Sequence, residues 1–202
     1  MCCVVLGLGS NRSFNGTDSI SLLRMAVTEM QKIMTDVVVS SVYRTKPMYV
    51  ENQDDFYNMV IAGNIQEGYN PQKLLQYIHE VEGFLGRDRS RELRFGPRAI
   101  DIDIEFFGDL EVNEPDLEIP HPRIAERAFV LQPLLEILPK CADDMKGEKL
   151  KKFETMKIDS NDVAFYMDSA EFLLLRVDNE VQDGNTDTRS SKDNPNFSCR
   201  TI

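Results

Sequence analysis

Residues 94–108 have the sequence RFGPRAIDIDIEFFG, in which apolar and acidic residues alternate strictly from position 100 to position 106. Because successive side chains of a β-strand point to opposite faces, one face of this segment is apolar and the other carries Asp101, Asp103 and Glu105. The pattern predicts a half-buried strand. Carboxylates on one strand face lie about 6.6–7 Å apart, and at that spacing Asp101 and Asp103 can bracket a pair of magnesium ions.

A solvated strand face is the alternative interpretation, and for two aspartates alone it is the better one. The preceding segment favours the metal-binding interpretation over the solvated face. Arginines occur there at positions 87, 89, 91, 94 and 98, in a chain whose formal net charge is −11. Guanidinium groups bind phosphate oxygens in pairs. Arginines beside two carboxylates therefore indicate a site for a polyphosphate with magnesium. We interpret Glu105 as a structural residue.

The composition is that of a soluble globular chain, with 202 residues, 42% of them hydrophobic and 28% charged. The acidic balance argues against nucleic-acid and membrane partners. Cysteines at positions 2, 3, 141 and 199 show no metal-binding spacing, which favours a reducing cytoplasm. No apolar run is long enough to cross a bilayer, and residues 1–8 are expected to form a buried strand and not a signal peptide.

Hydrophobic periodicity predicts strands over residues 3–9, 37–43, 56–65 and 100–106, and helices over residues 18–34 and 70–84. A polar loop, residues 44–55, follows the second strand, and residues 124–138 are predicted to form one apolar helix or two short ones. The glycines at positions 7 and 9 serve a turn or close backbone packing. The order β-α-β-β-α-β predicts a ferredoxin-like α+β fold, an antiparallel sheet with helices packed on one face.

The C-terminal region differs from the rest of the chain in composition. We predict a C-terminal appendage over residues 159–177, whose apolar stretch Phe172–Leu175 can add an edge strand. Residues 178–202 are rich in Asp, Asn, Ser, Thr and Gly and are predicted to be a disordered tail.

Five blocks together resemble the 6-hydroxymethyl-7,8-dihydropterin pyrophosphokinase family of folate biosynthesis. They are GSN at residues 9–11, SVYRT at 41–45, FYN at 56–58, RFGPRAIDIDI at 94–104, and IPHP at 119–122 followed by Arg127 and Phe129. The resemblance covers residues 3–139. It implies a ferredoxin-like fold, a catalytic domain over residues 1–158, and transfer of the diphosphate of ATP to the pterin hydroxymethyl group with release of AMP.

The resemblance also implies residue roles. Asp101 and Asp103 would be the ligands of two Mg²⁺ ions and, with Arg87 and Arg98, the catalytic residues. The residues expected to contact ATP are His79, Glu82, Arg89, Arg98, Ile104 through its backbone, His121 and Arg127. The residues expected to hold the pterin are Thr45, Lys46 and Met48 through their backbone, Phe56, Asn58, Phe95 and Phe129.

Single residues also have plainer interpretations. Phe56 and Phe129 can be core rings, His121 a loop histidine and Glu82 a solvated helix residue. Two other function classes stay open: a ferredoxin-like RNA-binding or sensing module, although no K/R-G-F/Y-type block is present, and a nucleotidyl transferase that releases pyrophosphate. We expect a cytoplasmic monomer that binds ATP and a reduced pterin, with no nucleic-acid or membrane partner.

Overall fold

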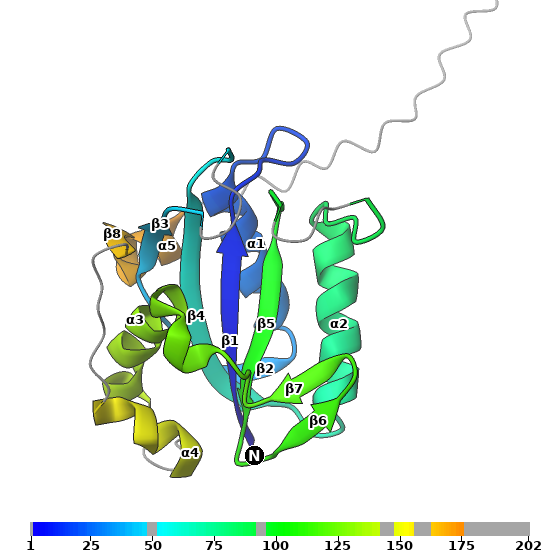
Figure 1. The fold of residues 1–202 in the computed structure, drawn as a ribbon, viewed down its shortest axis with the longest axis vertical. Coiled ribbons are helices and arrows are strands. Elements are labelled where there is room, and N and C mark those ends of the chain that lie inside the picture. Colours follow the sequence, from blue (N-terminus) through cyan, green and yellow to red (C-terminus); the bar gives the residue numbers. More distant parts are fainter. Residues whose placement is uncertain (1, 48–51, 92–95, 142–147, 156–162, 176–202) are drawn as a thin grey trace, which may run out of the picture.

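The computed structural model of the chain describes residues 2–47, 52–91, 96–141, 148–155 and 163–175. The predicted ferredoxin-like α+β fold is confirmed, because a six-stranded sheet runs in the order β5-β1-β4-β3-β8, with β2 also paired to β4 (Figure 1). Its centre is formed by β1 (Cys2–Ser10), β4 (Phe56–Ile65) and β5 (Asp101–Phe107), and β1 pairs antiparallel with both of the others.

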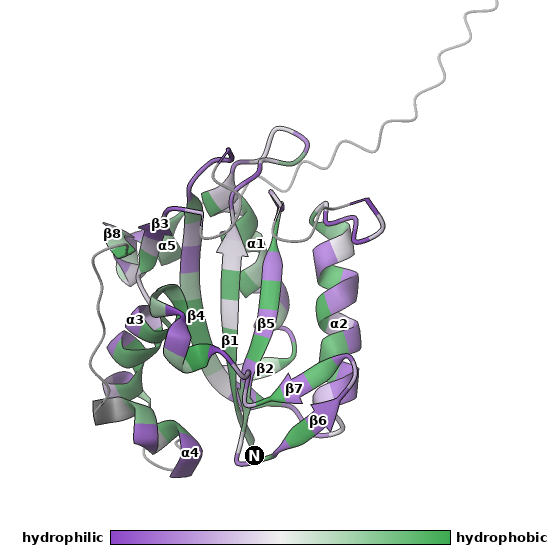
Figure 2. Cartoon of the chain, viewed as in Figure 1, coloured by the Kyte–Doolittle hydropathy of each residue, from purple (hydrophilic) through white to green (hydrophobic). Residues whose placement is uncertain are grey.

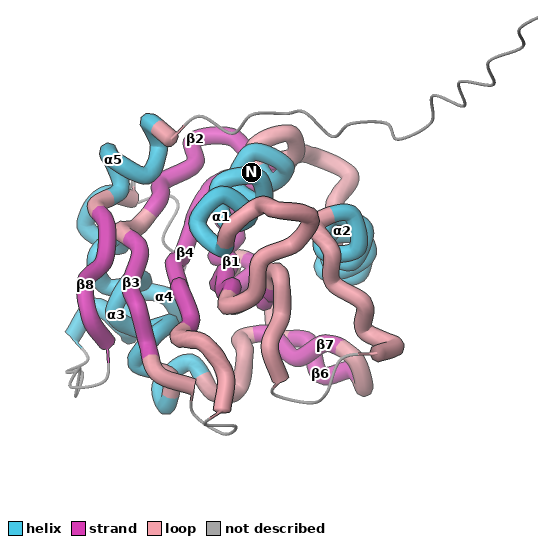
Figure 3. The backbone as a smooth tube through the Cα atoms, turned by 90° about the horizontal axis from the view of Figure 1, so that it is seen from above, coloured by secondary structure: helices cyan, strands magenta, loops and turns pink. Residues whose placement is uncertain are grey.

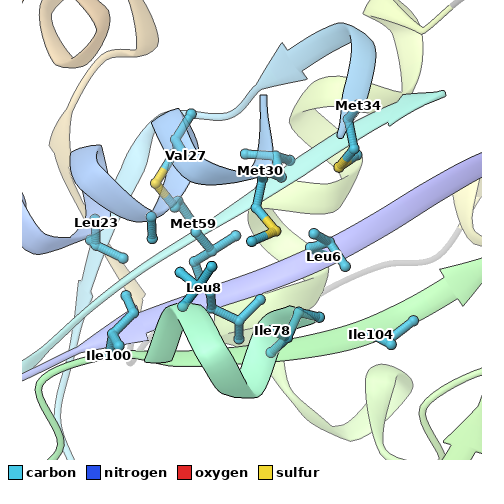
Figure 4. Close-up of a cluster of buried hydrophobic side chains, with 14 of the residues drawn as sticks. Leu6, Leu8, Leu23, Val27, Met30, Met34, Met59, Ile78, Ile100 and Ile104 are labelled. Carbon is cyan, nitrogen blue, oxygen red and sulfur yellow. The ribbon is translucent and has the colours of Figure 1, made fainter. Parts of the chain in front are cut away.

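Two helices cover one face of this sheet, as predicted. They are α1 (Ser19–Met30) and α2 (Pro71–Phe84). Their apolar stripes meet the even-numbered side chains of β1, so Leu6 and Leu8 are buried with Val27 and Met30 of α1 and Ile78 of α2 (Figure 4). In Figure 2 hydrophilic and hydrophobic residues alternate along α2, as expected of a helix with a single buried side.

The opposite face is partly covered as well, which the prediction of helices on one face did not include. Here α3 (Ala128–Ile137) packs on β4 and β3. Its apolar residues form a second buried cluster with Val5, Val60 and Phe106, whose side chains point away from α1 and α2. Short 3-10 turns flank α3 at Ile124–Glu126 and Leu138–Lys140, so the helical region predicted over 124–138, as one helix or two short ones, is confirmed as one helix with a 3-10 turn at each end.

Both predicted helix starts are capped by side chains. Asp18 accepts from the backbone N–H groups of Ile20 and Ser21 at 2.9 Å, and Asn70 accepts from Lys73 at 2.8 Å ahead of Pro71. The first helix is shorter than predicted. It ends at Met30, and after one turn Met34 begins β2 (Met34–Val39), so the last residues of the apolar stripe belong to the turn and the strand.

The single strand predicted over residues 37–43 is instead two strands, β2 and β3 (Val42–Thr45), both paired with β4. Ser40 and Ser41 separate them. The Ser40 hydroxyl accepts from the backbone N–H of Val60 at 2.9 Å, and Ser41 donates to Glu136 of α3. The Ser40 side chain thus binds a backbone N–H of β4, and the backbone N–H of Ser41 binds a side chain of α3, so the ladder is interrupted between β2 and β3.

Two further elements are short. The acidic segment after Gly108 contains a small hairpin, β6 (Val112–Glu114) with β7 (Leu117–Ile119). Short strands of three residues give little periodicity in sequence. A four-residue helix, α4 (Glu148–Lys151), continues as a 3-10 turn, Lys152–Thr155. No helix among the described residues is long and apolar enough to cross a membrane.

The C-terminal strand β8 (Val163–Met167) pairs with β3 at the sheet edge remote from α2 (Figure 3). The edge strand expected in the region 159–177 is thus present, but not at Phe172–Leu175 as predicted, because Phe172 lies in α5 (Ser169–Leu174), a short helix capped by Asp168. Phe172 is fully buried in the same cluster as α1 and α2. The predicted tail, residues 178–202, lies outside the described residues, and the domain division at residue 158 stays a prediction.

Candidate active site

A cavity of about 110 Å³ is lined by residues of β1, β3, β4 and β5 and of the start of α3. Most of the predicted site residues that the structure describes line it. These are Thr45, Lys46, Phe56, Asn58, Arg98, Asp101, Asp103, Arg127 and Phe129. The sequence expectation that these residues come together is therefore met by the geometry, while their individual roles stay predictions.

The floor of the cavity is made of backbone, because β1 carries glycines opposite the acidic strand. Gly7 pairs with Asp103 and Gly9 with Asp101. A Cβ atom on Gly7 would lie 2.7 Å from Oε1 of Glu105, and one on Gly9 would lie 2.9 Å from Oδ1 of Asn58. Both positions need a residue without a side chain, so of the two roles expected for these glycines, close packing is the one observed.

Asp101 is held by two arginines. Nη1 of Arg98 lies 2.6 Å from one carboxylate oxygen, and Nη1 of Arg87 bonds the other. Burial alone would raise the pKa of Asp101, but Arg87 and Arg98 outweigh it and hold the pKa below its ordinary value. Asp101 is therefore an ionised carboxylate. The two guanidinium groups bind the same oxygens that a metal ion would bind, and they are also the groups that a phosphate would bind.

Asp103 is held by one longer bond to an arginine. Nη1 of Arg127 lies 3.3 Å from its Oδ2. Burial and the neighbouring negative charge of Asp101 raise the pKa of Asp103 to about 6, which Arg127 only partly offsets. Two adjacent carboxylates that disfavour each other's charge are stabilised by a cation between them.

His121 does not line the cavity itself but contacts Arg127, which does. Its Nδ1 accepts from the backbone N–H of Arg123 at 3.2 Å, and its own backbone N–H donates to the carbonyl of Glu105 at 3.0 Å. Burial, followed by the charges of Arg127 and Arg123, lowers the pKa of His121 to about 4. The ring is therefore neutral near pH 7.

Glu82 of α2 is buried, with 1% of its surface exposed, so its interpretation as a solvated helix residue is wrong. Its carboxylate accepts from Nη1 of Arg87 and Nη2 of Arg89, each at 2.5 Å, and from the backbone N–H of Ile102 at 2.8 Å. Glu82 thus ties α2 and two arginines to the strand that carries Asp101.

Several predicted residues stand outside the cavity wall. His79 is exposed on α2, and Arg87, Arg89 and His121 lie behind residues that line the cavity. Ile104 belongs to the ladder, where it pairs with Leu6 and turns its side chain into the core. Met48 and Phe95 fall outside the described residues.

The aromatic part of the cavity has Phe56 and Phe129 in its wall, and neither ring is fully buried. Asn58, which is buried, donates from Nδ2 to the Thr45 hydroxyl at 2.9 Å. The Arg127 guanidinium lies 5.7 Å from the centre of the Phe129 ring. Half-exposed rings beside a buried amide suit a flat heterocycle, which stacks on rings and needs both a donor and an acceptor at its edge.

Sequence reasoning missed the role of Asn11. Its side-chain oxygen accepts from the backbone N–H of Arg98 at 2.8 Å, and its amide donates at 3.1 Å to Gln53 and to the carbonyl of Asp54. Asn11 therefore joins the loop before β4 to the segment that carries Arg98. Its place in the GSN block was the available signal, although the block itself did not say what the side chain contacts.

Glu105 was interpreted as structural, yet it also lines the cavity. It is fully buried, and neither of its carboxyl oxygens has a hydrogen-bond partner among the residues that the structure describes. Burial, and then the charge of Asp103, raise the pKa of Glu105 to about 8. A buried polar group without a partner costs on the order of 1–3 kcal/mol, so this carboxyl differs from every other acid of the site.

The donor set fits magnesium. Asp101 and Asp103 supply oxygen ligands from one strand face, and Mg²⁺ commonly takes one or two carboxylates and completes its shell with water and substrate phosphate. Within the described part of the chain no three His, Cys, Asp or Glu side chains form a complete cage. The site therefore suits a metal that arrives with a phosphate ligand.

A ferredoxin-like sheet that places two carboxylates and several arginines at the mouth of an aromatic cavity defines a class of protein. It is an enzyme that moves a phosphate group onto a ring-bearing substrate. A family model described as 7,8-dihydro-6-hydroxymethylpterin-pyrophosphokinase (HPPK) matches residues 5–139.

Relatives of known function agree with this match. The chain is 36% identical over 154 residues to a 2-amino-4-hydroxy-6-hydroxymethyldihydropteridine pyrophosphokinase of Aquifex aeolicus, covering 76% of this chain and 91% of the relative. It is 40% identical over 134 residues to the enzyme of that name from Bacillus subtilis, covering 65% of this chain and 75% of the relative.

Solved structures agree in fold. A Plasmodium falciparum HPPK-DHPS structure with pteroate superposes with a TM-score of 0.55 at 15% identity, covering 75% of this chain and 43% of that one. The chain thus spans less than half the length of that bifunctional neighbour. It belongs to the 7,8-dihydro-6-hydroxymethylpterin-pyrophosphokinase family. Membership makes it a pyrophosphokinase that uses ATP as co-substrate and acts in folate biosynthesis.

Proposed function

We propose that the chain transfers the diphosphate of ATP to the hydroxymethyl group of 6-hydroxymethyl-7,8-dihydropterin, giving the pterin diphosphate and AMP on the way to tetrahydrofolate. The observation that carries this proposal is that one cavity holds Asp101 and Asp103, the guanidinium of Arg98, and the rings of Phe56 and Phe129. Metal, phosphate and pterin would then meet within one site.

Asp101 and Asp103 would hold two Mg²⁺ ions. Bound there, the ions supply positive charge to the phosphates and orient them for in-line displacement. Arg87 and Arg98, which pair with Asp101 in this structure, are within reach of the same phosphates. If they exchanged the aspartate for phosphate oxygens, each would keep a charge-assisted partner, and Asp101 would be free to hold the ion.

The remaining nucleotide contacts are assigned to side chains around this centre. Arg127 and His121 lie on the α3 side of Asp103, while His79 and Arg89 lie on the α2 side. The backbone of Ile104 completes the set. Glu82 acts through Arg87 and Arg89, because its own oxygens are already occupied by them and by Ile102.

The pterin ring stacks between Phe56 and Phe129. Asn58 recognises its amide-like edge together with the backbone of Thr45, Lys46 and Met48, and Phe95 covers it. The two polar walls of the cavity, Asn58 with Thr45 and the acidic strand, put the ring's two ends in different environments. In the reaction the hydroxymethyl oxygen loses its proton to solvent and bonds the β-phosphorus of ATP. The bond from that phosphorus to the α–β bridging oxygen breaks, so AMP leaves with that oxygen.

We also propose that the enzyme acts as a monomer in the cytoplasm and that residues 1–158 form the catalytic unit. The formal net charge of −11 keeps copies of the chain apart and disfavours anionic surfaces. The residues assigned to substrate all come from residues 45–129 of this one chain.

The deciding experiment resolves the products that form from ATP, the reduced pterin alcohol and Mg²⁺ by ion-exchange chromatography. We expect AMP and the pterin diphosphate in equal amounts. Release of pyrophosphate would instead identify a nucleotidyl transferase, and ADP would identify transfer of one phosphoryl group. Binding of single-stranded RNA without any turnover would favour the non-enzymatic module.

A further inference from the structure

Glu105 is the one acid of the cavity that the proposed function leaves without a task. It lies on the same strand face as Asp101 and Asp103, one step deeper, and lines the same cavity. Its side chain is fully buried. Oε1 lies over the backbone of Gly7, where a Cβ atom would approach it to 2.7 Å. The chain thus makes room for this carboxyl by leaving out a side chain on the neighbouring strand.

The residues around Glu105 give its oxygens nothing to bind. Neither oxygen has a hydrogen-bond partner among the described residues. The nearest cation, Arg127, bonds Asp103 and contacts His121. Buried polar groups are nearly always paired, and one that faces a cavity is paired by what fills the cavity.

The chemistry of a carboxyl group limits which ligand groups can bind beside Glu105. Phosphate oxygens carry negative charge and would be repelled, and the arginines that suit them lie beside Asp101 and Asp103. The described residues contain no three-acid metal cage, so Glu105 adds no ready-made metal ligand to the two aspartates. The group that suits this position is an N–H donor on the ring that Phe56 and Phe129 enclose.

We propose that Glu105 is a specificity residue for the heterocyclic substrate and accepts a hydrogen bond from a ring N–H of the bound pterin. A carboxyl group accepts such a bond through an oxygen whether or not it carries a proton. Glu105 then recognises the ring from the cavity floor, while Asn58 recognises it from the opposite wall. This inference rests on the proposed function, because that function supplies the pterin.

The test measures dissociation constants by titration calorimetry for the wild type, Glu105→Gln and Glu105→Leu. Pterin alcohol is titrated in the presence of Mg²⁺ and an ATP analogue with a methylene bridge between the α- and β-phosphorus, and the analogue is titrated separately. We expect Glu105→Leu to weaken pterin binding at least about tenfold, since one hydrogen bond to a buried site is lost. Nucleotide affinity should stay within about twofold.

Glu105→Gln keeps an acceptor oxygen at the same reach, so we expect it to restore pterin affinity to within about threefold of the wild type. Glu118→Gln, at an exposed side chain of β7, is the matched control for loss of an acid elsewhere. Thermal unfolding of each variant verifies that it is folded, and if Glu105→Leu is not, Glu105→Gln is compared with Glu105→Ala.

Equal pterin affinity in the wild type and Glu105→Leu would overturn the inference and leave the proposed function standing. A parallel loss of nucleotide and pterin affinity would overturn it too, because it would indicate a role in metal or phosphate binding or in general packing. A wild-type protein that binds the nucleotide analogue but no pterin would overturn the proposed function itself, and the inference with it.

Discussion

Three acids two residues apart on β5 have three different environments. Arg87 and Arg98 keep Asp101 ionised. Asp103 pairs with one arginine, Arg127, and its pKa is raised to about 6, while the pKa of Glu105 is raised to about 8. The strand supplies the spacing, but the arginines that reach each carboxylate decide its charge. This gradient separates the two expected metal ligands from the residue at the cavity floor.

We expect Asp103→Asn to lower kcat/KM for AMP formation by about a thousandfold, because several kcal/mol of charge stabilisation through the metal are lost at roughly 1.4 kcal/mol per tenfold. The melting temperature should be unchanged or higher, since an amide removes the repulsion between Asp103 and Asp101. Initial rates at saturating Mg²⁺ and unfolding scans test this. A rate within tenfold of the wild type would refute the metal assignment.

Glu105 makes the stability of the ligand-free protein depend on pH. Its pKa is about 8 in the folded chain against an ordinary value near 4.5, so the unfolded state loses this proton first as pH rises. The free energy of unfolding therefore falls with pH across that window, by up to about 1.4 kcal/mol per pH unit.

The glutamine of Glu105→Gln cannot titrate. The melting temperature of this variant minus that of the wild type should therefore increase from pH 5 to pH 8. Thermal denaturation at both pH values, in the absence of nucleotide and metal, measures the difference. An advantage of the same size at pH 5 and pH 8 would contradict the raised pKa.

Among the secondary-structure elements, α2 and β5 are coupled most directly to the site. The helix contributes Glu82, whose carboxylate bonds the backbone N–H of Ile102 at the start of β5 as well as Arg87 and Arg89. A helix that fills the core with Ile78 thus also fixes the arginines one turn beyond. On the other face α3 brings Arg127 and Phe129 to the same cavity.

We expect Glu82→Ala to lower the free energy of unfolding by about 3 kcal/mol, because it leaves a largely buried guanidinium and a strand N–H without their carboxylate. Glu80→Ala on the exposed side of the same helix is the matched control and should change it by less than about 0.5 kcal/mol. Urea denaturation followed by circular dichroism measures both. Equal effects of the two substitutions would show that the buried network adds nothing specific.

At the scale of the whole molecule, the C-terminal segment is part of the fold at least as far as α5. β8 extends the sheet beside β3, and Phe172 fills the core beneath α1 and α2. The C-terminal segment lies at the sheet edge remote from Asp101, because β5, which carries Asp101, forms the other edge.

Deletion of residues 178–202 should accordingly leave both the melting temperature and kcat/KM within error of the full chain. Deletion from residue 156 should lower the stability by about 3 kcal/mol or more, because it removes Phe172 from a closed core. Differential scanning calorimetry of both truncated chains tests the pair. Unfolding on the shorter deletion would show that the predicted tail is part of the core.

The sequence alone determined the strand at β5, the helix starts near residues 18 and 70, the βαββαβ order and the set of blocks that marks the family, because these depend on neighbours a few residues apart. The alternation predicted over residues 100–106 holds as far as Glu105 and fails at Phe106, which packs on the opposite face of the sheet from Ile104. Only the tertiary structure decided that Glu82 is buried between two arginines, that Glu105 faces the cavity with no hydrogen-bond partner among the described residues, that Asn11 joins two loops, and that α3 covers part of the second face of the sheet. Periodicity tells which side of an element a residue occupies. What covers that side comes from segments tens of residues away, and burial and pairing follow from that cover.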